Sequence, residues 1–74
     1  MAGREQPHHR AERTHRDAAK RHDRGAEFWD DNGDAERAEL ERRAAQIERD
    51  AADLERDMAD LERDRANLDA REDR

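Results

Sequence analysis

The sequence predicts an all-α protein, a two-helix antiparallel hairpin that associates with further copies as a coiled coil or a four-helix bundle. Five large apolar residues recur at intervals of seven in the second half of the 74-residue chain. Seven residues make two turns of an α-helix, so these side chains share one stripe of one helix. A turn signal at Asn32 and Gly33 divides the helical pattern into a short and a longer helix. The five residues are Leu40, Ile47, Leu54, Leu61 and Leu68.

The first element is expected to be a short basic helix over residues 8–31. Residues 1–7 contain Gly3 and Pro7 and are expected to form a disordered tail. Residues 8–31 lack proline, and their alanines favour helix. If this helix folds back on the longer one, the expected neighbours are Trp29 with Leu40, His22 with Ile47 and His15 with Leu54. The expected hairpin contacts are therefore His15, Ala18, His22, Phe28 and Trp29.

A turn over residues 32–34 is expected to join the two helices. Asn32 and Gly33 tolerate the left-handed backbone conformation that commonly ends a helix. Asp34 is a typical residue at the start of a helix, where its carboxylate accepts hydrogen bonds from free backbone N–H groups. The second helix should then run over residues 35–72, because nothing in this segment breaks a helix.

The second helix has a heptad pattern that predicts an oligomer seam. The five large residues occupy position d, and mostly small residues occupy position a. Small side chains at position a let a neighbouring helix approach closely. The predicted seam comprises Leu40, Ala44, Ile47, Ala51, Leu54, Met58, Leu61 and Leu68.

Charge is distributed unevenly along the chain, whose net charge is −6. The first 24 residues carry an excess of basic side chains, and the remainder carries a large excess of acidic ones. In a parallel pair of the second helix, Asp50 would face Glu55 of the other copy, and an antiparallel pair sets e against e and g against g. Because these flanks are mostly acidic, the basic first helix is their expected complement, within the chain or between copies.

The residue types present argue against an enzyme, a cofactor protein or a metal protein. The chain has no Cys, Ser or Tyr, so most side-chain nucleophiles are missing. His15 and His22 lie two turns apart, about 10.5 Å along a helix, which is too far to share one metal ion. A histidine beside carboxylates would instead respond to pH.

Nucleic-acid binding and membrane insertion are also not expected. A basic segment before leucine heptads is typical of basic-zipper proteins, but these need one continuous helix, which Asn32 and Gly33 interrupt. No apolar run is long enough for a membrane span or a signal peptide, so a cytoplasmic protein is expected.

The segments HRDAAKRH at residues 15–22, GAEFW at residues 25–29 and NGDAERA at residues 32–38 resemble short, uncharacterised, charge-rich helical proteins of GC-rich actinobacteria. The resemblance implies a small acidic bacterial protein and no known activity.

The function expected from the sequence is that of a non-enzymatic scaffold or adaptor that self-associates, as a dimer or tetramer, through helix–helix contacts. The alternative is a small helical inhibitor or regulator that docks on a larger protein, with histidines providing pH sensitivity.

Overall fold

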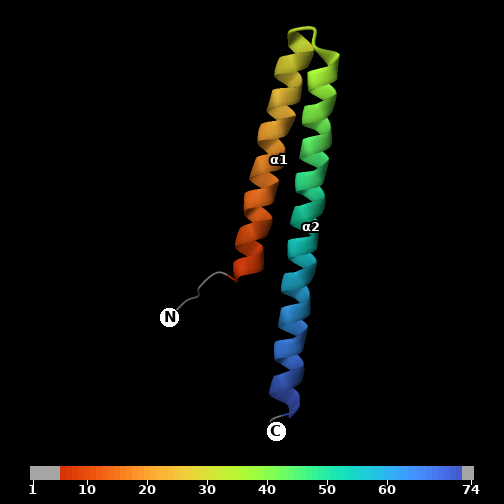
Figure 1. Cartoon of the computed structure of the whole chain (residues 1–74). Helices are drawn as coiled ribbons and strands as arrows, with labels where there is room; N and C mark the ends of the chain where they lie inside the picture. The colour runs from red at the N-terminus through yellow and green to blue at the C-terminus, as the bar shows by residue number, and fades with distance from the viewer. Residues whose placement is uncertain (1–5, 73–74) are drawn as a thin grey trace.

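The computed structural model describes residues 6–72 and confirms the predicted helical hairpin. Helix α1 spans Pro7–Asp31 and helix α2 spans Ala35–Glu72 (Figure 1). Helix α1 begins one residue earlier than predicted, because proline is well tolerated in the first turn, where its missing N–H has no intrahelical partner. The Gln6 side chain caps this end by accepting hydrogen bonds from the backbone N–H groups of His8 and His9. Of the predicted tail, residues 1–5 lie outside the described part of the chain.

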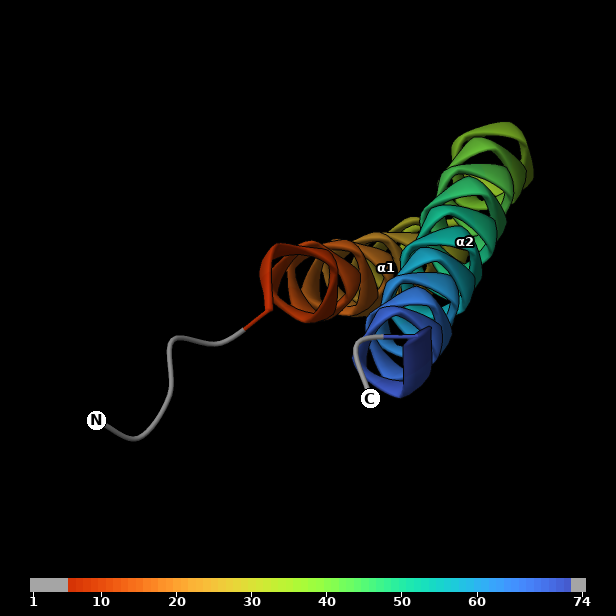
Figure 2. The same cartoon turned by 90° about the horizontal axis from the view of Figure 1, so that it is seen from below.

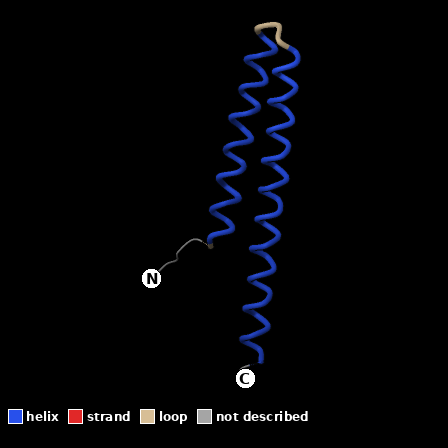
Figure 3. Tube along the Cα trace, viewed as in Figure 1, coloured by secondary structure: helices blue, strands red, loops and turns tan. Residues whose placement is uncertain are grey.

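The turn between the helices uses the three residues that the sequence singles out (Figure 3). The Asn32 side chain donates a hydrogen bond of 2.7 Å to the Phe28 carbonyl oxygen, and Gly33 adopts a φ of 75°. Asp34 starts α2: its Oδ1 accepts from the Arg37 backbone N–H at 3.0 Å. This backbone hydrogen bond, and after it the Arg37 guanidinium, lower the pKa of Asp34.

The contact between the helices is made of alanine. The buried residues within 6–72 are all alanines, and those of α2 recur at intervals of seven. A methyl side chain keeps two helix axes close together, so the pair packs without large apolar side chains between the helices. We call the α2 part of this contact the alanine face. The buried residues are Ala19 and Ala26 of α1, and Ala38, Ala45, Ala52 and Ala59 of α2.

The hairpin is one layer of two helices, with principal extents of 64 × 23 × 9 Å. Figure 2, which views the pair from below, shows α1 and α2 side by side. Helix α2 continues well beyond the first residue of α1 (Figure 1). Residues 61–72 are all exposed in consequence. The hairpin therefore buries only alanine side chains between its helices, and most of its large apolar side chains are exposed.

Candidate interaction surface

The large apolar residues of α2 form a separate, exposed stripe, which we call the leucine face: Leu40, Ile47, Leu54, Leu61 and Leu68. Their exposed fractions run from 55% at Leu54 to 69% at Leu61. The first four large residues each follow an alanine-face residue by two positions, as Ile47 follows Ala45, and Leu68 follows the exposed Ala66. Two residues turn a helix by about 200°, so the leucine face points about 160° away from the alanine face. The leucine face therefore lies on the side of α2 opposite α1.

The two flanks of the leucine face differ in chemistry. One flank holds Ala44, Ala51 and Met58, the predicted position-a residues, which are half-buried. The other flank holds exposed charged residues at position g: Glu36 lies at the turn end, and an arginine lies on either side of three central aspartates. The surface is thus an apolar stripe with one small-residue edge and one charged edge. The charged edge comprises Glu36, Arg43, Asp50, Asp57, Asp64 and Arg71.

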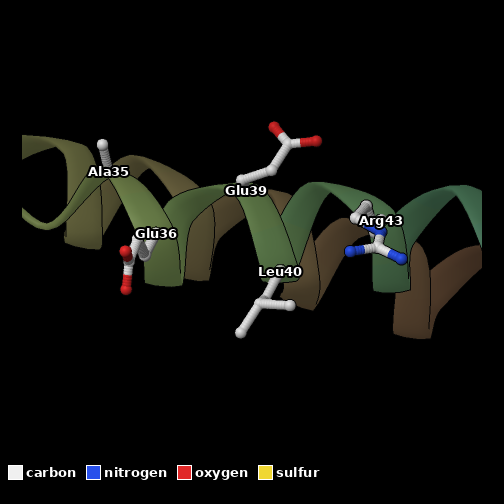
Figure 4. A pocket seen from close by; sticks show the side chains of 5 residues that line it. All are labelled: Ala35, Glu36, Glu39, Leu40 and Arg43. Atoms are coloured by element: carbon white, nitrogen blue, oxygen red, sulfur yellow. The ribbon is translucent and has the colours of Figure 1, made fainter.

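Shallow depressions lie at both ends of the leucine face. Figure 4 shows the one near the turn, where Leu40 projects from the α2 ribbon between Glu36 and Arg43. All five side chains that line it come from α2, so no second element encloses it. The depression at the other end is lined by Asp64, Asn67, Leu68 and Arg71. Neither has the enclosed, convergent shape of a small-molecule site.

A row of histidine–glutamate pairs joins α1 to α2 along one side of the alanine contact. His22 Nδ1 lies 3.1 Å from Glu41, and His15 Nδ1 lies 2.6 Å from Glu48. His8 contacts two carboxylates, with Nδ1 2.5 Å from Glu55 and Nε2 2.9 Å from Glu62. The hydrogen bond to Glu55, and after it the one to Glu62, outweigh burial and raise the pKa of His8. These four glutamates occupy heptad position e.

Arginine–aspartate pairs join the helices on the other side of the alanine contact. They connect Arg42 to Asp30 at 2.9 Å, Arg49 to Asp23 at 3.1 Å and Arg16 to Asp53 at 3.1 Å. Arg16 also pairs with Glu12 of its own helix, and this contact lowers the pKa of Glu12. In two of these pairs the arginine comes from α2, and in the third it comes from α1. These ion pairs are mostly exposed, so they fix the register of the hairpin more than its stability.

The histidines do not contact the residues that the heptad pattern suggests. His22 meets Glu41 instead of Ile47, and His15 meets Glu48 instead of Leu54. The register follows from the short turn, but α2 is rotated so that its alanine face points at α1. Large side chains at position d would hold the helix axes further apart than the alanines do, so the alanines take the intrachain contact.

The remaining predicted hairpin residues have mixed positions. Trp29 is half-buried, and the Arg37 guanidinium lies 4.9 Å above its ring. Phe28 is 56% exposed and packs edge-on against Trp29, so it contributes little to the contact between helices. Ala18 is half-buried, whereas its neighbour Ala19 is buried. The alanine face is not among the predicted contacts, although the spacing of seven between its residues is visible in the sequence.

The described residues offer no other recognisable site. Within 6–72, no group of three or more His, Asp or Glu side chains is arranged to hold a metal ion. No helix in the same range is long and apolar enough to cross a membrane. Comparison with known proteins adds nothing to the geometry: no protein-family model, no curated protein and no solved structure matches this chain.

Proposed function

We propose that this protein is a non-enzymatic, self-associating helical scaffold or adaptor, and that the leucine face is its interface. The observation that carries the proposal is the exposure of all five large residues by more than half of their surface. The stripe from Leu40 to Leu68 is about 42 Å long. Contiguous apolar surface of this kind is typical of protein–protein contacts. The hairpin itself cannot cover it, because α1 lies on the opposite side of α2.

The test of self-association is the mass of the purified chain in solution at micromolar concentration. Sedimentation equilibrium should give at least twice the 8.7 kDa mass of the chain. Leu54→Asp should weaken self-association at least 100-fold, because it places one charge per copy in the middle of the apolar interface. Its helicity should stay close to that of the wild type, since Leu54 lies outside the alanine contact.

Gln46→Asp is the matched control, because it adds the same charge to an exposed position of α2 outside the leucine face. The control should keep the wild-type mass. A monomeric, fully helical wild-type protein would contradict the proposal, as would equal masses for the two variants.

The alternative function is a small regulator that docks its leucine face on a larger protein, with pH sensitivity from the histidine row. The acids in the middle of the charged edge, Asp50 and Asp57, favour a basic amphipathic helix as that partner. A monomeric chain whose Leu54 is nevertheless needed for binding such a helix would favour this function over self-association. No enzymatic step is part of either proposal.

A further inference from the structure

We propose that a second copy of the chain covers the leucine face in the antiparallel orientation, so that α2 packs against α2 with the chains running in opposite directions. This inference rests on the proposed self-association and specifies its geometry. Two observations favour this arrangement over a parallel pair: the sizes of the facing residues and the order of charges along the charged edge. The histidines on the position-e glutamates offset the repulsion that remains.

The sizes of the residues match in the antiparallel pair. In this orientation position a of one helix packs against position d of the other. Ala51 then faces Leu54 of the second copy, and Ala44 faces Leu61. Met58, the widest apolar residue at position a, faces Ile47. At the ends of the pair, position a holds arginines: Arg65 faces Leu40 and Arg37 faces Leu68. Each large aliphatic side chain at the centre therefore meets a small or flexible one, which fills space without voids.

The charged edge is complementary to itself when it is reversed. Position g faces position g in an antiparallel pair, so Arg43 meets Asp64 of the second copy and Glu36 meets Arg71. The two-fold symmetry repeats each attraction. The only like-charged contact on this edge is Asp50 with Asp57, at the centre. The mostly acidic flanks predict that g-to-g contacts are no better than the parallel ones, but residue-by-residue pairing makes them attractive at both ends, where Arg43 and Arg71 lie.

A parallel pair lacks this complementarity. Position g would then face position e of the other copy. Asp50 would meet Glu55, Asp57 would meet Glu62, and Glu36 would meet Glu41. Arg43 would form the one attractive contact of the row, with Glu48 of the second copy. Most contacts along the parallel interface would therefore be repulsive, which disfavours it.

The histidine row offsets the acids on the other edge of the antiparallel pair. There position e faces position e, which brings Glu41 toward Glu62 of the second copy and Glu48 toward Glu55. Each of these glutamates already holds a histidine of its own α1 at 2.5–3.1 Å. The imidazoles provide hydrogen-bond donors and, when protonated, positive charge beside these carboxylates.

The charges also select one register. If one helix slides by seven residues in one direction, Arg43 meets Arg71 of the second copy and Asp50 meets Asp64. A slide in the other direction places Glu36 against Asp64 and leaves Leu68 beyond the start of the opposing helix. In the proposed register the two end depressions of the leucine face meet each other, because Glu36 and Arg43 lie in one and Arg71 and Asp64 in the other.

Cysteine cross-linking tests the orientation, since the natural chain contains no cysteine. Arg43→Cys and Asp64→Cys are made separately and mixed in a thiol redox buffer. We expect a disulfide between the two different variants, identified by its mass, and little disulfide within either variant alone. Two copies of residue 43 lie about 30 Å apart in the antiparallel pair, which is beyond disulfide reach. Both positions are exposed, so the hairpin should fold in each variant.

Leu40→Cys is the reciprocal variant, because its two copies are adjacent in a parallel pair and about 37 Å apart in the proposed one. Self-linking of Leu40→Cys, without the mixed disulfide, would overturn the antiparallel orientation and leave self-association standing. A monomeric wild-type chain that gives neither product would overturn the proposed function itself. The mixed disulfide, without self-linking at residue 40, supports the inference.

Discussion

The alanine face and the leucine face of α2 repeat at the same interval of seven residues, yet they differ in burial. The alanine face is buried against α1, whereas the leucine face remains exposed. Small side chains permit close approach of a helix that a three-residue turn already holds antiparallel. Large side chains need a partner that brings its own apolar surface. A repeat of seven residues therefore indicates which face of a helix makes a contact. The size of the side chains on that face indicates how close the neighbouring helix can lie.

The two faces also differ in the free energy that each can gain by burying its side chains against a partner. A buried alanine contributes roughly one methyl group, about 0.8 kcal/mol, whereas a buried leucine contributes about 1.5–3 kcal/mol. The contact between α1 and α2 is thus weak, and it forms because the short turn already holds the two helices side by side. The leucine face, in contrast, has the apolar side chains needed for contact between separate chains. This difference explains why a chain with so few large apolar residues places them on the outside of its hairpin.

The largest expected effect on the free energy of unfolding comes from placing a leucine-sized side chain on the alanine face. Ala45→Leu places a large side chain on a fully buried position of the alanine face. The helices must separate to accommodate it, and overpacking of this kind should cost about 3 kcal/mol of the free energy of unfolding. Urea unfolding followed by circular dichroism at a fixed protein concentration measures the loss.

Ala66→Leu is the matched control, because residue 66 continues the same alanine spacing but is exposed. The control should change the free energy of unfolding by less than about 0.5 kcal/mol. Equal losses in the two variants would show that the alanine face does not limit how closely the helices pack.

Local signals in the sequence predict the helices and their turn, because these depend on neighbouring residues. The absence of helix breakers predicts α2 over 35–72, and Asn32, Gly33 and Asp34 carry the turn chemistry that the structure uses. The exception is the start of α1 at Pro7, where a first-turn proline is compatible with helix. These elements do not depend on which face of α2 meets α1.

The face that α2 presents to α1 is not predictable by the same reasoning. Leucine is a stronger hydrophobic signal than alanine, so the pattern predicts the contact at position d. Ala38, Ala45 and Ala52 are also explained by the high helix propensity of alanine. The deciding quantity is the distance between helix axes, which depends on both helices together. The histidine–glutamate row follows from that rotation. The sequence predicts attraction between the basic first helix and the acidic flanks, but it places His22 against Ile47 and His15 against Leu54.

A smaller effect is expected at Gly25, which lies on α1 where the Glu41 side chain crosses it. A Cβ at residue 25 would overlap the Glu41 carboxylate, with the Glu41 Cδ 2.9 Å away. The Glu41 side chain is flexible and can swing aside, at the cost of its partly exposed contact with His22. Alanine stabilises a helix interior by about 1 kcal/mol relative to glycine. Gly25→Ala should therefore raise the free energy of unfolding by about 0.5 kcal/mol.

A double-mutant cycle separates the gain in helix propensity at residue 25 from the clash with the Glu41 side chain. In a Glu41→Ala background the clash is absent, so Gly25→Ala should give the full helix-propensity gain of about 1 kcal/mol. A net loss of stability in the wild-type background would mean that the Glu41 side chain cannot move aside. That result would place residue 41 in the rigid part of the hairpin contact.

The smallest expected effect is a pH dependence that arises from His8. Its pKa is raised in the folded hairpin by hydrogen bonds to Glu55 and Glu62. The stability contributed by this histidine is therefore fully present below its ordinary pKa and is lost as pH rises through the folded pKa. The wild-type hairpin should lose stability as pH rises above about 6.5. The effect is modest because the contacts are partly exposed to water.

His8→Gln should flatten this dependence, since glutamine keeps a hydrogen-bond donor and cannot take up a proton. His9→Gln is its control: His9 is the next residue, and its ring lies near Glu12 of its own helix at 3.6 Å. Urea unfolding at several pH values should give the wild-type slope for the control and a shallower slope for His8→Gln. Identical slopes would mean that the contacts of His8 with Glu55 and Glu62 hold the register of the hairpin without linking its stability to pH.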